Sequence, residues 1–354
     1  MSILGRRFAS HIIEYPGNIF AASWVLVPQW NIYGAEKGYN HVLESFREVE
    51  KKFPDGAFHV GEFCSVSCKN TLHIVSKLAK DLRTRSQREI VDYPTLLPVA
   101  NWNEFFKVAL SPEYYGTIPN FFMTARPGSI WKRLFPNESL HFIYANHSFM
   151  PLSKMRVADD TIWPTFSEDP QVINELKETA IKDLDTLLTL RHAELKKGGR
   201  FCFDVLLECK VPKESPWKQL NEVVQSFVDS GRIKKEERDK LALRNFERND
   251  EIINTVLSRH EKNFRVVVKE RMTSRFPAWS EYEKDKDANK LAKNYTDWLK
   301  EWTALAILNT LSATRPQEER NKIVSDIYAE LQARCSKYPI PLDVNLYDFI
   351  VEKI

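Results

Sequence analysis

Short apolar, aromatic-rich segments alternate with segments of helical periodicity along most of this chain. We expect strands where the apolar runs are short: 57–63, 139–146, 200–207, 264–270 and 346–352. Apolar residues at helical spacing predict helices at 71–82, 170–197, 216–230, 249–261, 288–311 and 317–336, with Gly198-Gly199 ending the second of these. The segment SLHFIYAN (139–146) is apolar nearly throughout, which is typical of a strand covered on both faces. Such alternation predicts an α/β fold with a mostly parallel sheet flanked by helices.

The second half of the chain contains more helix than one sheet needs, at 208–243 and 285–336, which predicts an α-helical cap. Ligands of open parallel sheets bind beyond the carboxyl ends of the strands. We therefore expect the functional residues just after Phe63, after Tyr93, around 126–131 and after Ile143.

Composition excludes several other classes of protein. The 51 Lys and Arg nearly balance the 48 Asp and Glu, so no polycation for nucleic acid is indicated. Five cysteines without C-x-x-C spacing and eight scattered histidines predict neither a disulfide framework nor a metal site. No run of about 18 apolar residues occurs, and none follows the first two arginines, so we expect a soluble cytoplasmic protein with no membrane partner. The chain has only 11 glycines among its 354 residues, about 3% against an ordinary 7%, which argues against a glycine-rich nucleotide loop.

The segment ARPGSIWKRLFPNESLHFIYANHSFMPLS (125–153) resembles the signature block of the SABATH carboxyl methyltransferases, PGSFYxRLFPxxSLHFxHSSYSLxWLS. The match runs in register without a gap through 127–129, 133–136, 139–142, Ser148 and 152–153. Weaker similarities follow in the family's order: EFCSVSCKNT (62–71) to DLGCSSGPNT, LPVANWNEFF (97–106) to LPGNDFNxxF, and KGGRFCFDVLL (197–207) to the GGRMVL strand.

The resemblance implies a class I methyltransferase fold, a Rossmann-like, mostly parallel sheet with a helical cap, as a single unit over 1–354. We expect the core at about 40–210, 249–275 and 317–354, and the cap at about 211–248 and 276–316. It further implies S-adenosyl-methionine as cofactor, a small-molecule carboxylate as substrate, and a homodimer. No catalytic residue is expected, because a carboxylate is already ionised at neutral pH and needs no general base.

By the same resemblance, the cofactor would lie against a defined set of residues: Glu62, Cys64, Leu96, Leu97, Ser129 and Ile130. Several of them depart from the family pattern. Cys64 and Cys68 replace glycines of the cofactor loop, where a missing Cβ permits close approach. Leu96 stands where the family has an Asp that accepts hydrogen bonds from the ribose, and Asp92 could replace that Asp only if the alignment contains a gap.

The implied substrate contacts are Val27, His147, Met150 and Pro151. Val27 lies near the position of a Gln and Pro151 at the position of a Trp, which in the family donate to the substrate carboxylate. Alternative interpretations stay open at several positions: Ser129 as a turn residue, Glu62 as a surface acid and His147 as a hydrogen-bonded strand-end residue.

Two functional hypotheses follow. The first is an S-adenosyl-methionine-dependent O-methyltransferase of a small-molecule carboxylate. The second is a catalytically inactive descendant with weak or absent cofactor binding, acting as a binding, regulatory or scaffolding protein, because the departures affect independent parts of the site.

Overall fold

A computed structural model describes residues 12–14, 35–63, 68–98, 100–146, 148–149, 151–208, 211–243 and 246–354. Within these residues a seven-stranded sheet has the order β4-β3-β2-β5-β7-β9-β8, in which β9 alone runs antiparallel to its neighbours. Its strands, in spatial order, are β4 (Phe121–Met123), β3 (Ile90–Thr95), β2 (Phe58–Phe63), β5 (Leu140–Ala145), β7 (Leu195–Leu207), β9 (Asp343–Lys353) and β8 (Phe264–Arg275). The predicted α/β fold with a mostly parallel sheet is confirmed, and β8 and β9 extend beyond the predicted segments.

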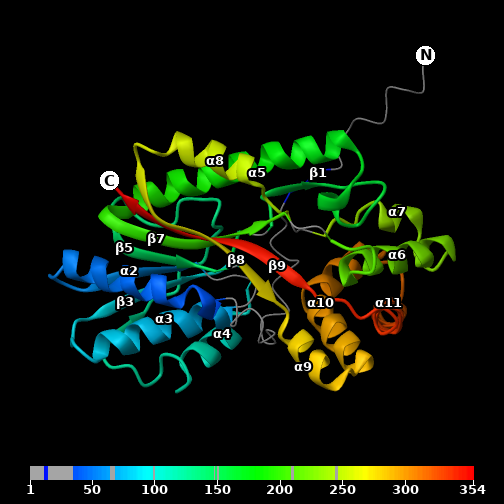
Figure 1. Cartoon of the computed structure of the whole chain (residues 1–354), viewed down its shortest axis with the longest axis horizontal. Coiled ribbons are helices and arrows are strands. Elements are labelled where there is room, and N and C mark those ends of the chain that lie inside the picture. Colours follow the sequence, from blue (N-terminus) through cyan, green and yellow to red (C-terminus); the bar gives the residue numbers. More distant parts are fainter. Residues whose placement is uncertain are drawn as a thin grey trace, which may run out of the picture.

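Helices cover both faces of the sheet (Figure 1). One face carries α2 (Tyr39–Lys52), α3 (Cys68–Arg83) and α4 (Trp102–Ala109), and the other carries α5 (Pro170–Glu194) and α8 (Asp250–Arg259). The strand residues alternate between two hydrophobic clusters: Val60 packs with the α2–α4 side and Phe63 with the α5–α8 side. A short antiparallel pair, β1 (Ile12–Glu14) with β6 (Lys154–Arg156), lies outside the main sheet.

One predicted boundary is wrong. The helix expected over 170–197 ends at Glu194, and Gly198-Gly199 lies inside β7 rather than after the helix. Leu140 pairs with Leu195 but Phe142 pairs with Arg200, so β7 carries three extra residues at this point. Gly198 has a φ of +84°. The two glycines therefore permit a bulge in the strand, a use that sequence alone does not distinguish from a helix C-terminus.

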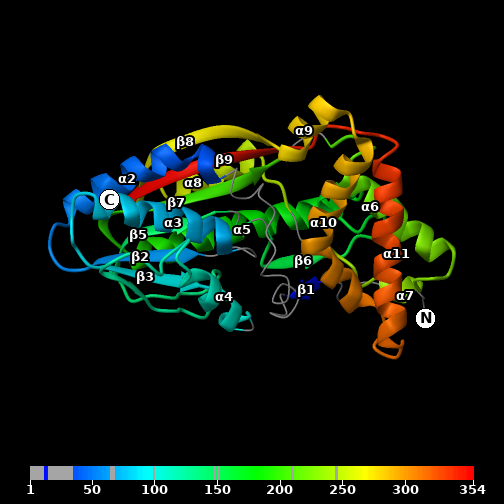
Figure 2. The same cartoon turned by 90° about the horizontal axis from the view of Figure 1, so that it is seen from below.

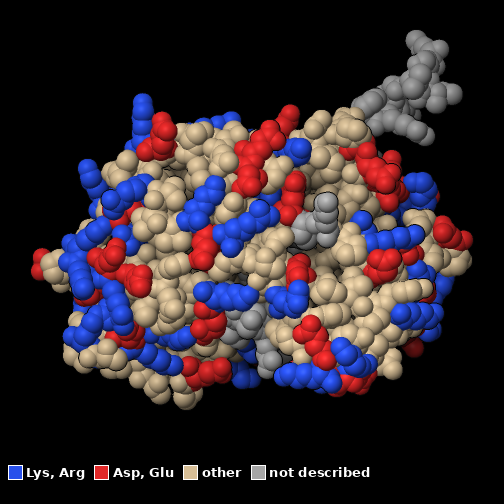
Figure 3. Space-filling model, in the orientation of Figure 1, with Lys and Arg blue, Asp and Glu red and all other residues tan. Residues whose placement is uncertain are grey.

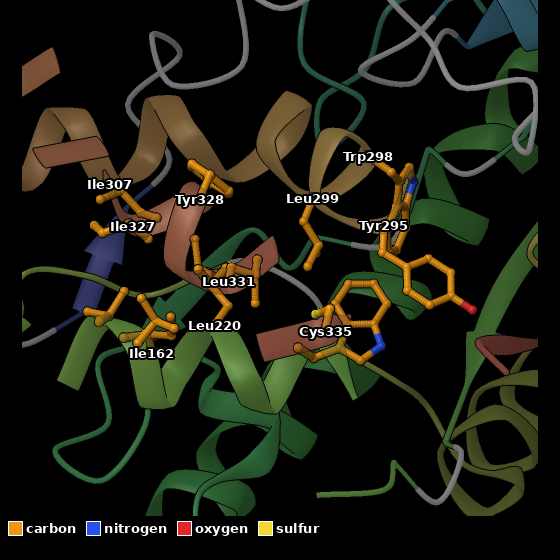
Figure 4. Packing of buried hydrophobic residues seen from close by; sticks show 14 of the residues in the cluster. Ile162, Leu220, Tyr295, Trp298, Leu299, Ile307, Ile327, Tyr328, Leu331 and Cys335 are labelled. Carbon is orange, nitrogen blue, oxygen red and sulfur yellow. The ribbon is translucent and has the colours of Figure 1, made fainter. Parts of the chain in front are cut away.

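The cap is a helical bundle built from α6 (Pro216–Asp229), α7 (Lys235–Arg238), α9 (Pro277–Asp285), α10 (Ala288–Thr310) and α11 (Gln317–Cys335) (Figure 2). Leu220, Leu299 and Leu331, from three different helices, meet in its core (Figure 4). Because α11 packs mainly with α6 and α10, we propose that it belongs to the cap, with β9 returning the chain to the core.

Acidic and basic side chains are interspersed over the face seen in Figure 3. Within the described part of the chain, no helix is both long enough and apolar enough to cross a bilayer.

Candidate functional site

The segment after β4 continues beside β3 and carries two predicted cofactor residues to the carboxyl edge of the sheet. The backbone N–H groups of Thr124, Arg126 and Gly128 donate to the carbonyls of Asp92, Pro94 and Leu96, at 2.9, 2.9 and 2.8 Å. Ser129 and Ile130 therefore follow directly at the end of β3. Gly128, the residue before Ser129, thus lies beside Leu96, while the Leu96 side chain packs on the α2–α4 face and the Ile130 side chain on the α5–α8 face.

The conformation of the loop at 129–136 is fixed from within and from α5. Ser129 Oγ accepts a hydrogen bond from the Trp131 N–H at 3.3 Å, so the serine does act as a turn residue. Glu194 Oε1 accepts from the N–H groups of Leu134 and Phe135, at 2.7 and 3.2 Å. The end of α5 thereby holds the second half of the loop.

Arg191 completes this support. Its guanidinium donates to the Ile130 carbonyl at 3.2 Å and to the Lys132 carbonyl at 3.1 Å, and its Nε lies 2.7 Å from Glu194 Oε2. Both charged side chains are 0% exposed. A buried ion pair is tolerated only when its members are paired and hydrogen-bonded, and here the bonds go to the loop that presents Ser129 and Ile130. Neither residue could be predicted from the sequence, because nothing in their spacing ties them to a loop some 60 positions earlier.

Glu62 is a fully buried side chain on the α2–α4 face of the sheet. The Tyr115 hydroxyl donates to Glu62 Oε2 at 2.7 Å. The surface-acid interpretation of Glu62 is therefore wrong, because the carboxylate sits at the end of β2 inside the protein.

Asp92 lies beside Glu62. It pairs with Val60 across β2 and β3, two residues before the level of Glu62, and both side chains project from the same face. Neither oxygen of Asp92 receives an N–H or O–H bond from the described residues. Burial, and then the negative charge of Glu62, raises the pKa of the Asp92 carboxyl well above its usual range. Two ionised carboxylates can only accept hydrogen bonds and repel each other. The pair of Glu62 and Asp92 is therefore most stable when it retains one proton.

The position that would contact a ribose is apolar. Leu96 is 3% exposed and packs in the same hydrophobic cluster as Leu72 and Val75 of α3. Asp92 does not stand in for the missing carboxylate, because it lies within β3 and faces Glu62 rather than the end of the strand.

A buried polar network links the ends of three neighbouring strands. Asn70, in the first turn of α3, donates to the backbone and side-chain oxygens of Asn146 at 3.3 and 2.7 Å. Asn146 donates in turn to Asp204 Oδ2 at 3.3 Å. Ser148 Oγ donates to the Phe63 carbonyl at 2.6 Å. These bonds connect the end of β2 and the start of α3, which flank the predicted cofactor loop, to the chain leaving β5.

No role for this network was predicted from the sequence. Its available signal was Asn70-Thr71, which matches the end of the family motif DLGCSSGPNT. The pairing with Asn146 and Asp204 spans 76 and 58 positions and needs the tertiary fold.

The histidine of the signature block, His141, contacts residues of β2. His141 Nδ1 accepts the backbone N–H of His59 at 2.9 Å, and its ring stacks between Phe58 and His59. Burial lowers the pKa of His141 to about 3, so the ring is neutral near pH 7.

On the substrate side, the structure describes Pro151, which is half-buried and has no side-chain donor. Val27, Cys64, His147 and Met150 lie outside the described residues. Among the described residues, no group of three or more His, Cys, Asp or Glu side chains could hold a metal ion.

The chain is similar to a family of known proteins. The profile of a family described as SAM dependent carboxyl methyltransferase matches residues 35–338. A benzoic acid/salicylic acid carboxyl methyltransferase of Petunia hybrida is 27% identical over 197 residues, which cover 50% of this chain and 55% of that enzyme. A probable caffeine synthase of Coffea canephora is 24% identical over 267 residues, covering 67% of this chain and 68% of the relative. The match thus spans about half the length of the petunia enzyme and about two thirds of the coffee protein.

Among solved structures, a loganic acid methyltransferase with SAH superposes with a TM-score of 0.63 at 16% identity, covering 92% of this chain and 94% of that chain. That likeness shows the fold. Together with the family match over 304 residues, from 35 to 338, it establishes that this chain belongs to the SAM-dependent carboxyl methyltransferases, the SABATH family.

Proposed function

We propose that this protein binds S-adenosyl-methionine at the carboxyl ends of β2 and β3 and methylates the carboxylate of a small molecule. The observation that carries the proposal is the loop at 124–130. It is hydrogen-bonded along β3 and supported by the buried Arg191–Glu194 pair, so Gly128 is held beside Leu96, and Ser129 and Ile130 follow it directly. A purine can pack on the aliphatic Ile130 side chain without any hydrogen bond.

The bound cofactor would supply an electrophilic methyl group. The chain's own task is to position a carboxylate in line with that group and to exclude water, since an ionised carboxylate needs no base. The network of Asn70, Asn146 and Ser148 supports this task, because it ties the two chain segments that leave β2 and β5 at the predicted site.

Substrate class, a homodimer and a cytoplasmic location belong to the same proposal. The petunia and Clarkia breweri relatives are named for benzoic and salicylic acid, so aromatic carboxylates are the first candidates for a substrate.

A second candidate, a non-catalytic ligand-binding descendant, is favoured by two observations. Leu96 is part of the hydrophobic core where a ribose acceptor is expected, and Pro151 has no donor for a substrate carboxylate. Loss of a buried donor–acceptor pair costs about 1–3 kcal/mol, so each replacement weakens binding or turnover.

A methyl-transfer assay separates the two. The protein is incubated with methyl-labelled S-adenosyl-methionine and benzoate, salicylate or loganate, and transfer to an extractable ester is counted. Ile130→Asp places a charge where the purine would pack and should abolish both binding and transfer. Leu110→Ser, at a side chain 56% exposed at the end of α4, should leave both unchanged.

Transfer by the wild type that is lost in Ile130→Asp supports the enzyme. Cofactor binding without transfer to any carboxylate supports the non-catalytic descendant. Absence of both contradicts the proposal.

A further inference from the structure

The buried face of α5 carries three charged side chains. Asp183, Arg191 and Glu194 are 4%, 0% and 0% exposed, whereas the other buried residues of this helix are apolar. Positions 183 and 194 are about three turns and about 16 Å apart along the helix, so they lie on the same face. Buried charges destabilise a helix face relative to leucine unless they are paired and hydrogen-bonded. The partners of these three residues therefore indicate what the charges do.

Asp183 holds the chain just after Pro151. Its Oδ2 accepts a hydrogen bond from the Ser153 N–H at 2.7 Å, and its Oδ1 accepts one from the Ser153 hydroxyl at 2.5 Å. Two bonds to an ionised carboxylate fix the backbone and the side chain of Ser153 together. Leu152, between Pro151 and Ser153, is fully buried. The segment 151–153, which carries the predicted substrate contact Pro151, is thus fixed by α5.

Arg248 brings a positive charge to this bonded pair. Its backbone is held at the end of β7, because its N–H donates to the Leu206 carbonyl and its carbonyl accepts from the Glu208 N–H, both at 2.9 Å. The Arg248 side chain is 1% exposed. Burial raises the pKa of the Asp183 carboxyl, and the bonds from Ser153 and the charge of Arg248 oppose that rise. Both influences favour the ionised carboxylate that accepts from Ser153.

The other end of the charged face bonds to a different segment. Glu194 accepts from the Leu134 and Phe135 N–H groups, and Arg191 donates to the Ile130 carbonyl. That loop carries the predicted cofactor contacts. One helix thus bonds to the predicted cofactor loop at one end and to the predicted substrate segment about three turns away.

We propose that Asp183 is a positioning residue for the carboxylate substrate and that the Arg191–Glu194 pair positions the cofactor, so that α5 sets the spacing of the two reactants. This proposal rests on the proposed methyl-transfer function. In-line transfer needs the carboxylate oxygen and the methyl group at a fixed separation, and a misplacement of about 1 Å costs up to about 100-fold in rate. Asp183 acts through Ser153 and the segment 151–153.

The test measures the two ends of the helix separately. Calorimetric titration gives the Kd for S-adenosyl-methionine. A methyl-label assay at saturating cofactor gives kcat/KM for whichever of benzoate, salicylate and loganate the wild type methylates fastest. Asp183→Asn leaves Ser153 one acceptor oxygen in place of two, so it should lower kcat/KM at least about fivefold and leave the Kd within about twofold. Glu194→Gln removes the charge that pairs with Arg191, so it should raise the Kd at least about fivefold.

Two further variants make the result specific. Asp185→Asn is a matched control on the same helix, because Asp185 lies 3.2 Å from His260 and bonds to neither segment, and it should leave both constants unchanged. Ser153→Ala removes only the hydroxyl donor, so it should lower kcat/KM less than Asp183→Asn does. The double variant of Asp183 and Ser153 should show a non-additive loss. If Asp183→Asn does not fold, Ser153→Ala decides alone.

A change of the Kd and of kcat/KM by the same factor in Asp183→Asn would show a general loss of structure and would overturn the proposal. Wild-type values of both constants in that variant would overturn it too. A wild type that transfers no methyl group would instead overturn the proposed function, and this proposal with it.

Discussion

Asp92→Asn should make the protein more stable, by an amount that grows with pH. Asp92 is fully buried and faces Glu62, so its pKa in the folded protein lies well above the value of about 3.9 in an unfolded chain. Below that unfolded value, both states carry the proton and the carboxyl costs nothing. As pH rises above it, the unfolded chain ionises while the folded protein keeps the proton, so wild-type stability falls until the folded pKa is passed.

The magnitude follows from this linkage. Within the window between the two pKa values, one retained proton costs the wild type about 1.4 kcal/mol per pH unit. Asparagine is nearly isosteric and never ionises, so the variant lacks this slope. The difference in the free energy of unfolding, variant minus wild type, should therefore rise by about that amount per unit from pH 4.5 upward.

Urea unfolding followed by tryptophan fluorescence at half-unit steps from pH 4.5 to 8 measures the difference directly. Asp81→Asn is a control of opposite sign, because hydrogen bonds from Arg47 and Arg85 lower the pKa of the Asp81 carboxyl. That variant should lose stability most at neutral pH and least in acid. A flat difference for Asp92→Asn, or one that falls with pH, would refute the placement of a protonated carboxyl pair in this core.

Three further variants test other contacts. Glu194→Ala should lower the free energy of unfolding, measured with urea, by about 3–5 kcal/mol, because it leaves the buried Arg191 guanidinium unpaired. Adding Arg191→Met to this variant should recover part of that loss. A loss below about 1 kcal/mol for Glu194→Ala would contradict the buried pair. Gly38→Ala should lower the Tm, because the added Cβ overlaps the Asp348 carboxylate. Adding Asp348→Ala to this variant should restore part of the Tm, and an unchanged Tm in the double variant would argue against that contact. Burial raises the pKa of Glu301 to about 7, so this carboxyl stabilises the fold least above pH 7. The Tm of Glu301→Gln minus that of the wild type should therefore increase between pH 5 and 8. A decrease in this difference would contradict the raised pKa.

The alternation of strands and helices was predictable because burial of one face sets the spacing of apolar residues within each segment. Strands β2 and β5, together with the long cap helices α10 and α11, lie within a few residues of the predicted ranges. Local sequence pattern is not sufficient where it fits two different structures. Gly198-Gly199 permits a bulge in β7, although a glycine pair after a long helical stretch equally predicts a helix C-terminus.

Only the parts of the candidate site that lie within sequence motifs were predictable. The resemblance in the ungapped signature block predicted Ser129 and Ile130 as cofactor contacts, and the chain path along β3 brings the preceding Gly128 to Leu96. The burial of Glu62 against Asp92 depends on strand register, and register is set by pairing between segments some 30 residues apart. No spacing within either segment reveals it.

The most direct measurement is a calorimetric titration of the wild-type protein with S-adenosyl-methionine and, separately, with its demethylated product, S-adenosyl-homocysteine. We predict saturable binding of one cofactor per chain in both titrations, with the heat abolished in Ile130→Asp and retained in Leu110→Ser. Absence of binding heat for both compounds, confirmed by an unchanged Tm at saturating concentration, would contradict a cofactor site at the ends of β2 and β3.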